Sequence, residues 1–206
     1  PDTVVAVDAP LIIGPQRTAE RQLARVFGRC HASAYTATPA FLARYDALAG
    51  PRLAASLAAQ GFSLRPSSAA LPGRSAIEVY PHAAHVVLFG LDHIIRYKKG
   101  RLAARTEGLG IYREHLAAFL CKLPLSPLDP MLATLLSRPL TGLSGRDMKR
   151  IEDMLDAITC ALVALRAREA PTTVFGCDEH GHIVVPGLPP GAVLPPALCR
   201  ACGAAE

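Results

Sequence analysis

Two carboxylates, Asp153 and Asp156, lie within an otherwise apolar helical stretch late in the chain. A helix is predicted there because apolar residues recur at steps of three and four, namely Ile151, Leu155, Ile158, Leu162 and Leu165. Asp156 should therefore face protein, where a carboxylate needs a cation, a hydrogen-bond donor or a raised pKa. Asp153 lies three residues earlier on the same face and is expected to share that partner.

A pair of converging carboxylates suits a hard divalent cation such as Mg²⁺. The competing structural interpretation is an Asp pair neutralised by Arg146, Lys149 or Arg150, which precede it on the same helix. From the residues alone the two interpretations carry similar weight.

Two further carboxylates stand at or near the ends of predicted strands. Residues 3–7 form a β-branched run that ends at Asp8, and residues 75–80 read as a second strand containing Glu78. Because α/β folds place their chemistry at the carboxyl ends of strands, Asp8 is a candidate functional residue. The alternative is that Asp8 only begins a turn. Together the acids could hold two Mg²⁺ or Mn²⁺ ions and act on a phosphodiester, and the predicted catalytic set is Asp8, Glu78, Asp153 and Asp156, with Asp8, Asp153 and Asp156 as metal ligands.

Basic and imidazole side chains supply candidate substrate contacts. Lys98 and Lys99 form a basic cluster that could contact phosphates, and Arg17 could enter the same cleft. His82, close to Glu78, is a candidate proton shuttle, whereas His85 is expected to pack within a helix. A solvated charged turn is the structural alternative for the two lysines.

A zinc site is the weaker of the metal hypotheses. Soft and imidazole ligands occur in two short groups near the end of the chain, which are Cys177, His180 and His182 in one group and Cys199 and Cys202 in the other. The first group spans a predicted hairpin turn that already has a local explanation. Whether Cys177, His180, Cys199 and Cys202 bind zinc is therefore left open.

The elements that must position these residues alternate between strands and helices. Hydrophobic periodicity and turn signals predict an α/β layered domain over residues 1–186, followed by a Pro/Gly/Ala-rich tail over 187–206. The predicted helices span residues 17–27, 38–48, 52–60, 82–89, 101–123, 129–137 and 145–168. The predicted strands span residues 3–7, 75–80, 172–175 and 183–185, the last two forming a hairpin.

The composition of the chain and the motifs that it lacks limit the classes of function that are expected. The 206 residues are half hydrophobic, which suits one sizeable domain, and the net charge of +5 would help a polyanionic partner. No apolar run reaches about 18 residues, so membrane insertion is not expected and the cytoplasm is the default compartment. Phosphate-binding and dinucleotide-binding glycine motifs are absent, as is the nucleophile elbow of hydrolases.

Several segments of the chain resemble a known family. They are Val7-Asp8-Ala9-Pro10, Arg17-x-x-Glu20, Gly61-Phe62, Glu78-Val79-Tyr80-Pro81-His82-Ala83, Tyr97-Lys98-Lys99-Gly100-Arg101 and Glu152-Asp153-x-x-Asp156-Ala157. On these segments, from about Val4 to Pro186, the chain is similar to the predicted nucleases of the RNase H-like fold catalogued as domain of unknown function 429.

The resemblance implies an RNase H-like three-layer α/β domain with a mixed central sheet and a metal-dependent nuclease acting on nucleic acid. Asp8 matches the acid of a neighbouring strand, Asp153 and Asp156 match the acids of the terminal helix, and Glu78 is either a ligand or a hydrogen-bond anchor. The family pattern begins with a strand carrying an Ile-Asp-Gly-like segment, and this chain begins after it. We therefore expect a sheet without that strand and weak activity. The alternative function is a non-catalytic RNase H-like binding module.

Overall fold

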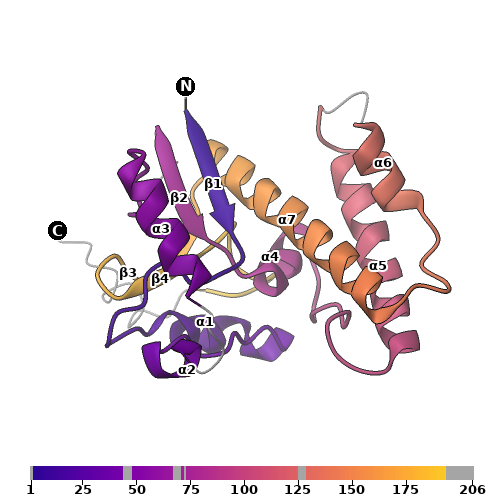
Figure 1. Cartoon of the computed structure of the whole chain (residues 1–206), viewed down its shortest axis with the longest axis horizontal. Helices are drawn as coiled ribbons and strands as arrows, with labels where there is room; N and C mark the ends of the chain where they lie inside the picture. Colours follow the sequence, from indigo (N-terminus) through magenta and orange to yellow (C-terminus); the bar gives the residue numbers. More distant parts are fainter. Residues whose placement is uncertain (1, 44–47, 67–70, 72, 125–128, 194–206) are drawn as a thin grey trace. The chain divides into compact units, whose positions relative to one another are not determined.

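The computed structural model describes residues 2–43, 48–66, 71, 73–124 and 129–193 (Figure 1). The chain divides into two compact units, which are treated separately below. The sheet unit comprises Pro1–Ile94 with Cys160–Glu206, and the helical unit comprises Ile95–Thr159.

The sheet unit alternates strands and short helices along the chain. Its elements are β1 (Thr3–Val7), α1 (Ala19–Phe27), the 3₁₀ helix η1 (Gly28–Cys30), α2 (Pro39–Ala43), α3 (Ala49–Ala59), β2 (Arg74–Glu78), α4 (Pro81–Leu88), β3 (Thr173–Cys177) and β4 (Gly181–Val185). The helical unit contains α5 (Leu102–Leu120) and α6 (Pro130–Ser137), and α7 (Gly145–Glu169) begins in the helical unit and ends in the sheet unit.

Two small sheets form the centre of the sheet unit. β1 and β2 are parallel, with Val7 opposite Glu78 at their carboxyl ends, so Asp8 follows directly at that edge. β3 and β4 form an antiparallel hairpin, and an isolated parallel bridge between Val79 and Val184 joins the two sheets. The arrangement therefore mixes parallel and antiparallel pairing, as expected for the fold class at its coarsest level.

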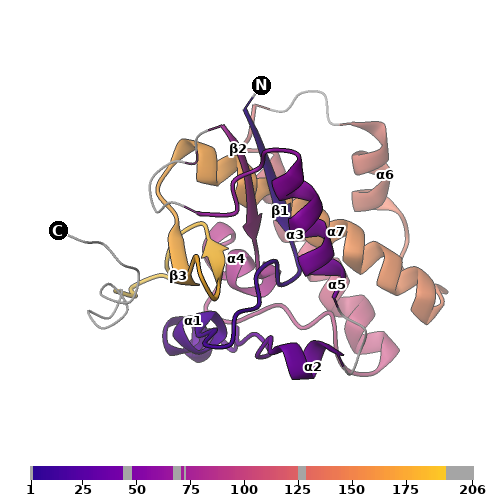
Figure 2. The same ribbon diagram turned by 60° about the vertical axis from the view of Figure 1, so that its left-hand side comes forward.

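Helices cover both faces of the β1–β2 pair. On one face, Leu57 of α3 packs in a cluster with Ala76 of β2, and α3 runs beside the strands in both views (Figures 1 and 2). On the other face, Ile77 of β2 packs with Val163 from the carboxyl-terminal part of α7. Adjacent residues of β2 thus point into different cores, as the alternation of side chains along a strand requires.

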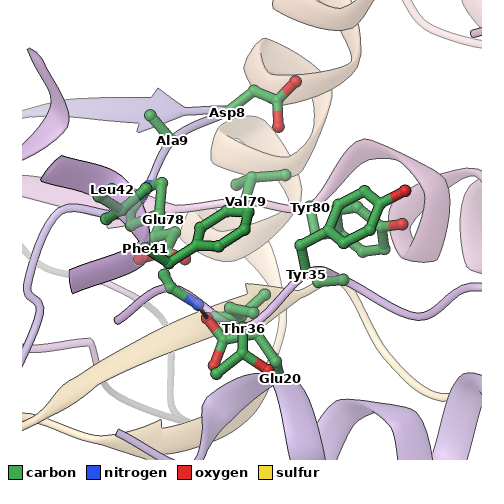
Figure 3. A pocket seen from close by; sticks show the side chains of 14 residues that line it. Asp8, Ala9, Glu20, Tyr35, Thr36, Phe41, Leu42, Glu78, Val79 and Tyr80 are labelled. Carbon is green, nitrogen blue, oxygen red and sulfur yellow. Dashed lines mark hydrogen bonds between the residues drawn. The ribbon is translucent and has the colours of Figure 1, made fainter. Parts of the chain in front are cut away.

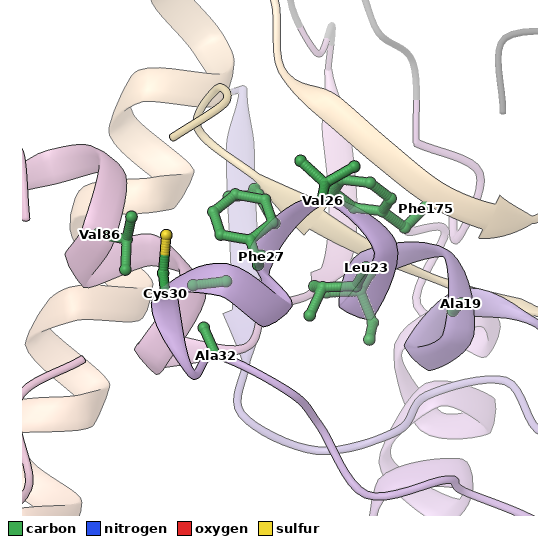
Figure 4. Packing of buried hydrophobic residues seen from close by; sticks show 11 residues of the cluster. Ala19, Leu23, Val26, Phe27, Cys30, Ala32, Val86 and Phe175 are labelled. Carbon is green, nitrogen blue, oxygen red and sulfur yellow. The ribbon is translucent and has the colours of Figure 1, made fainter. Parts of the chain in front are cut away.

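A separate cluster fixes α1 against the β3–β4 hairpin (Figure 4). Leu23 and Phe27 of α1 are fully buried there, and the Phe27 ring meets the Phe175 ring of β3 edge to face at 5.9 Å. Burial of a side chain of this size contributes roughly 1.5–3 kcal/mol relative to exposure. The packing holds the start of α1, and with it Arg17, next to the sheet.

The predicted helices and strands appear in the structure with shifted ends. α3 begins at Ala49, three residues before the prediction, because Pro51 can occupy the first turn, where its missing N–H would have no helical partner. The caps are as expected. Thr38, Asp129 and Ser144 each accept a hydrogen bond from a backbone N–H of the following helix.

Parts of two predictions fall on residues that the structure leaves undescribed. The helix predicted over 38–48 appears as α2, and residues 44–47 lie outside the described residues. Most of the predicted tail, from residue 194 onward, does so as well. Among the residues that are described, no helix has the length and apolar character needed to cross a bilayer.

Substitution of Gly181 tests how closely the β3–β4 hairpin approaches Ile12 and Arg17. Its φ of +105° disfavours any side chain, and a Cβ there would collide with the Ile12 carbonyl and the Arg17 guanidinium. We expect Gly181→Ala to lower the free energy of unfolding by more than about 3 kcal/mol in urea denaturation.

Gly61→Ala is the matched control, because Gly61 has a φ of +81° with nothing near its Cβ position. Its cost should be about 1–2 kcal/mol, the penalty for the left-handed conformation alone. Equal costs for the two substitutions would show that the close approach of Gly181 to Ile12 and Arg17 adds nothing to the cost.

Candidate functional site

Arg17 is the centre of a buried polar cluster in the sheet unit. Its Nε donates to Glu20 Oε1 at 2.7 Å, and its Nη2 donates to Glu78 Oε1 at 2.5 Å. Nη1 donates both to Glu78 Oε2 at 3.1 Å and to the Ile12 carbonyl at 2.6 Å. The Arg17 side chain is only 1% exposed. A planar guanidinium is suited to this fork of contacts, which a lysine could not reproduce.

Glu78 is an anchor within this cluster. One of its oxygens accepts from Arg17, and the other accepts from Arg17 and from the backbone N–H of Leu11 at 3.1 Å. Of the two roles that the sequence left open for Glu78, the contacts favour the hydrogen-bond anchor. Arg17, predicted to contact substrate, is engaged with protein groups instead.

Burial shifts two titratable groups of this cluster in opposite directions. It raises the pKa of Glu78 to about 7, against the opposing charge and hydrogen bonds of Arg17. It lowers the pKa of His182 to about 4, and the positive charge of Arg17 acts in the same direction. Neither ring nitrogen of His182 has a hydrogen-bond partner among the described residues.

A pocket of about 240 Å³ lies beside the cluster, at the carboxyl edge of β1 and β2 (Figure 3). Asp8, which is exposed, contributes to its wall together with the buried carboxylates of Glu20 and Glu78. Its aromatic side chains are those of Tyr35, Phe41 and Tyr80. Figure 3 shows Asp8 and Glu20 on opposite sides of the pocket, with the aromatic residues between them.

Asp156 is the centre of a second polar cluster, in the helical unit. Its carboxylate is 4% exposed, accepts a 2.6 Å hydrogen bond from Tyr97 Oη and lies 2.8 Å from Lys98 Nζ. Tyr112 packs against the Tyr97 ring and hydrogen-bonds to the Thr159 hydroxyl. The expectation that a buried Asp156 has a cation, a hydrogen-bond donor or a raised pKa is confirmed, since Lys98 and Tyr97 supply the first two.

The expectation that Asp153 shares the partner of Asp156 is wrong. The Asp153 side chain is 60% exposed and pairs with Lys149 at 2.7 Å. The buried acid one turn before Asp156 is Glu152, which pairs with Lys149 and Arg105. Glu152 lies four residues before Asp156, a spacing that also places two side chains on one face of a helix, so the signal for this buried acid was present in the sequence.

The remaining predicted residues have varied surroundings. Lys99 is exposed in the helical unit. His82 is 7% exposed, and its ring packs between those of Tyr80 and His85, while His85 is fully buried in α4 as expected. Cys177 is a free thiol on the hairpin, and Cys199 and Cys202 lie outside the described residues.

The described residues contain no preformed group of side chains that would support either metal hypothesis. Across the described ranges, no three His, Cys, Asp or Glu side chains are grouped so that they could hold a metal ion. Asp8 belongs to the sheet unit and Asp156 to the helical unit, so their convergence stays a prediction.

Fold and site define an α/β protein with a buried Arg–carboxylate cluster at the carboxyl edge of two parallel strands. The chain belongs to the family described as "Protein of unknown function (DUF429)", whose model matches residues 1–180. No curated protein and no solved structure matches it.

The opposed pKa shifts predict a pH dependence that substitution should reveal. Since the pKa of Glu78 is raised, its contribution to stability is complete below pH 4.5 and is lost as the pH rises through 7. Glu78→Gln removes this loss. The unchanged protein should therefore lose stability between pH 4.5 and 7 that the variant keeps. The difference in the free energy of unfolding, variant minus unchanged protein, should rise by roughly 3 kcal/mol over this range.

His182→Leu should act in the opposite sense. Since the pKa of His182 is lowered, its contribution is present above pH 6.5 and is lost as the pH falls through 4. The variant should gain stability relative to the unchanged protein as the pH falls across that range. Urea unfolding at several pH values measures both variants, and parallel pH profiles would contradict the assignment.

A double-mutant cycle tests the Lys98–Asp156 pair. Lys98→Met leaves a buried carboxylate without its cation, and Asp156→Asn should relieve that cost. The coupling energy from urea unfolding should be about 1–2 kcal/mol. The exposed pair Lys149–Asp153 on the same helix is the matched control, with an expected coupling of about 0.5 kcal/mol or less. Equal couplings would show that burial adds nothing.

Proposed function

We propose that the protein is a metal-dependent nuclease of the RNase H-like fold that hydrolyses phosphodiester bonds in nucleic acid. The observation that carries the proposal is the position of Asp8. Its exposed carboxylate directly follows β1, level with the end of the parallel strand β2, and it contributes to the wall of a pocket. Ligand sites of parallel α/β sheets lie at this edge.

The two segments most specific to the family resemblance support the same proposal. Glu78, which begins one of them, is anchored by Arg17, and Tyr97 and Lys98 of the other segment contact Asp156. Each segment therefore supplies buried polar contacts that a simple packing role would not need. Buried polar groups of this kind are often retained for specific positioning.

The acids differ in how well they fit Mg²⁺ or Mn²⁺. Asp8 fits, because its carboxylate is exposed, and Mg²⁺ is commonly bound by one or two carboxylates together with substrate phosphates. Asp156 fits if Lys98 gives up its contact, since the ammonium occupies the position of a cation at Oδ2. Glu78 does not fit, because Arg17 and Leu11 already occupy both of its oxygens.

Residues of the chain would position the acids and contact the substrate. A bound divalent ion would supply charge neutralisation and an activated water. Arg17 holds Glu78 and the loop after Asp8 in place through its contact with Ile12. Lys99 is exposed and can contact a phosphate, and the net charge of +5 favours a polyanionic partner.

A non-catalytic binding module is the second candidate function. The observation that favours it is the neutralisation of the buried acids, Glu78 by Arg17 and Asp156 by Lys98. Carboxylates held in this way stabilise the fold without a metal. For either function we propose a cytoplasmic location, which is consistent with the free thiols of Cys30, Cys121 and Cys177.

Metal-dependent cleavage is the direct test of the nuclease. The purified protein is incubated with single- and double-stranded DNA and RNA, with Mn²⁺ or with EDTA. We expect cleavage only with Mn²⁺, and Asp8→Asn should reduce the rate about 100-fold or more by removing an oxygen ligand. Mn²⁺ should also raise the melting temperature of the unchanged protein by binding the folded state, but not that of Asp8→Asn.

Asp178→Asn is the control for the change of charge, since Asp178 is exposed on the β3–β4 turn. It should cleave at the unchanged rate and keep the shift in melting temperature. Binding of nucleic acid without cleavage or any effect of Mn²⁺ would refute the nuclease and leave the binding module.

A further inference from the structure

Aromatic side chains are concentrated at the pocket beside Asp8. The chain contains five Tyr, six Phe and no Trp, and three of these rings, Tyr35, Phe41 and Tyr80, line the pocket (Figure 3). Tyr35 is 70% exposed and Phe41 is 39% exposed, so parts of both side chains face solvent. No Lys, Arg or His is among the described residues that line the pocket. The wall is therefore better suited to a flat, uncharged group than to a phosphate.

The segment that carries Tyr35 is fixed on both sides of it. Tyr80 Oη donates to the Ser33 carbonyl at 3.1 Å, and the backbone N–H of Ala37 donates to Glu20 Oε1 at 3.2 Å. These two anchors lie two residues before and two residues after Tyr35. A side chain on a segment that is already ordered loses less conformational freedom when a ligand binds. Tyr35 is therefore a preformed contact surface at the pocket.

Phe41 and Thr36 complete this wall. Phe41 lies on α2, where its N–H donates to the Thr38 hydroxyl at 3.1 Å and its neighbour Leu42 is buried. The helix is thus held in place while the Phe41 side chain remains partly exposed. Thr36 is exposed and lines the same pocket, so its hydroxyl can donate to or accept from a polar group of a ligand.

We propose that this pocket receives one unpaired nucleobase of a nucleic-acid strand. The inference rests on the proposed function, because it names the form of nucleic acid on which the site would act. Nucleobases are flat, carry hydrogen-bonding groups at their edges and stack on exposed aromatic side chains. Stacking on Tyr35 and Phe41 requires no net charge on the acids of the wall. A base held there brings the adjoining phosphodiester bond towards Asp8.

The size of the pocket and the cost of unpairing define the substrate class. The volume of about 240 Å³ is smaller than the roughly 300–1,000 Å³ of pockets for drug-sized ligands, so it suits a single base. A base within a duplex is stacked and paired, and its extraction is costly. Single strands, loops and frayed ends offer such a base without that cost. The site therefore favours unpaired nucleic acid over a duplex.

Binding by the full chain in EDTA, followed by fluorescence anisotropy and amide NMR shifts, tests the proposal in the absence of cleavage. The probes are labelled single strands of DNA and RNA, their duplexes, an abasic strand of equal length and the free nucleosides. We expect at least one single strand to bind at least about tenfold more tightly than its duplex, the abasic strand or any nucleoside. Amide shifts should occur at residues 34–37 and 78–80.

Variants separate stacking from contacts with phosphate. Tyr35→Leu and Phe41→Leu should each weaken binding of the single strand about fivefold or more, whereas Tyr35→Phe keeps the ring and should bind within about twofold of the unchanged protein. None of these substitutions alters charge, so the slope of log affinity against log salt should stay the same. Tyr35 is largely exposed, so its substitution leaves the fold intact.

The base pocket and the nuclease can fail separately. Equal binding of the single strand and the abasic strand, equal binding of the single strand and the duplex, a nucleoside that binds as tightly as the strand, or unchanged binding by Tyr35→Leu would each overturn the base pocket. Cleavage with Mn²⁺ alongside any of these results would leave the nuclease standing. Binding as expected without cleavage would remove the nuclease and keep the base pocket.

Discussion

The buried guanidinium of Arg17 is the interaction on which the sheet unit depends. It joins the start of α1 to Glu78 at the end of β2 and to the Ile12 carbonyl in the loop after β1. Through Glu20 the same cluster reaches the backbone N–H of Ala37. A buried ion pair of this kind is costly to break, because removal of the cation leaves two desolvated carboxylates. Arg17 and Glu20 therefore tie together several segments that surround the pocket.

This pairing also distinguishes the two carboxylates at the carboxyl ends of the parallel strands. Both carboxylate oxygens of Glu78 accept hydrogen bonds from Arg17 or Leu11. Its side chain at the end of β2 therefore stabilises the fold. Asp8, one residue beyond the matching position of β1, is exposed at the same edge. Two acids that look equivalent in the sequence thus have different surroundings, because Glu78 is buried against the Arg17 guanidinium whereas Asp8 is exposed.

The sequence predicted the elements well and the partners poorly. Strand β1 and helix α7 follow from local apolar patterns, and the caps at Asp129 and Ser144 follow from residue type. The partners of the buried acids come from distant segments. Glu78 meets Arg17 across 61 positions and Asp156 meets Tyr97 across 59. No local periodicity encodes such contacts, so the need for a partner was predictable but its identity was not.

The two buried ion pairs differ in how readily they can be exchanged. Arg17 is 1% exposed and binds Glu78 through a planar fork, a geometry that no other side chain or ion reproduces. Lys98 is a point charge whose side chain is 26% exposed, and it meets a single oxygen of Asp156 at 2.8 Å. A divalent cation could replace that ammonium at the carboxylate, and a phosphate could draw it away. Glu78 is therefore fixed by its partner, whereas we expect the partner of Asp156 to be exchanged more readily. If the proposed nuclease is correct, Asp156 is the better candidate of these two buried acids for a part in its chemistry.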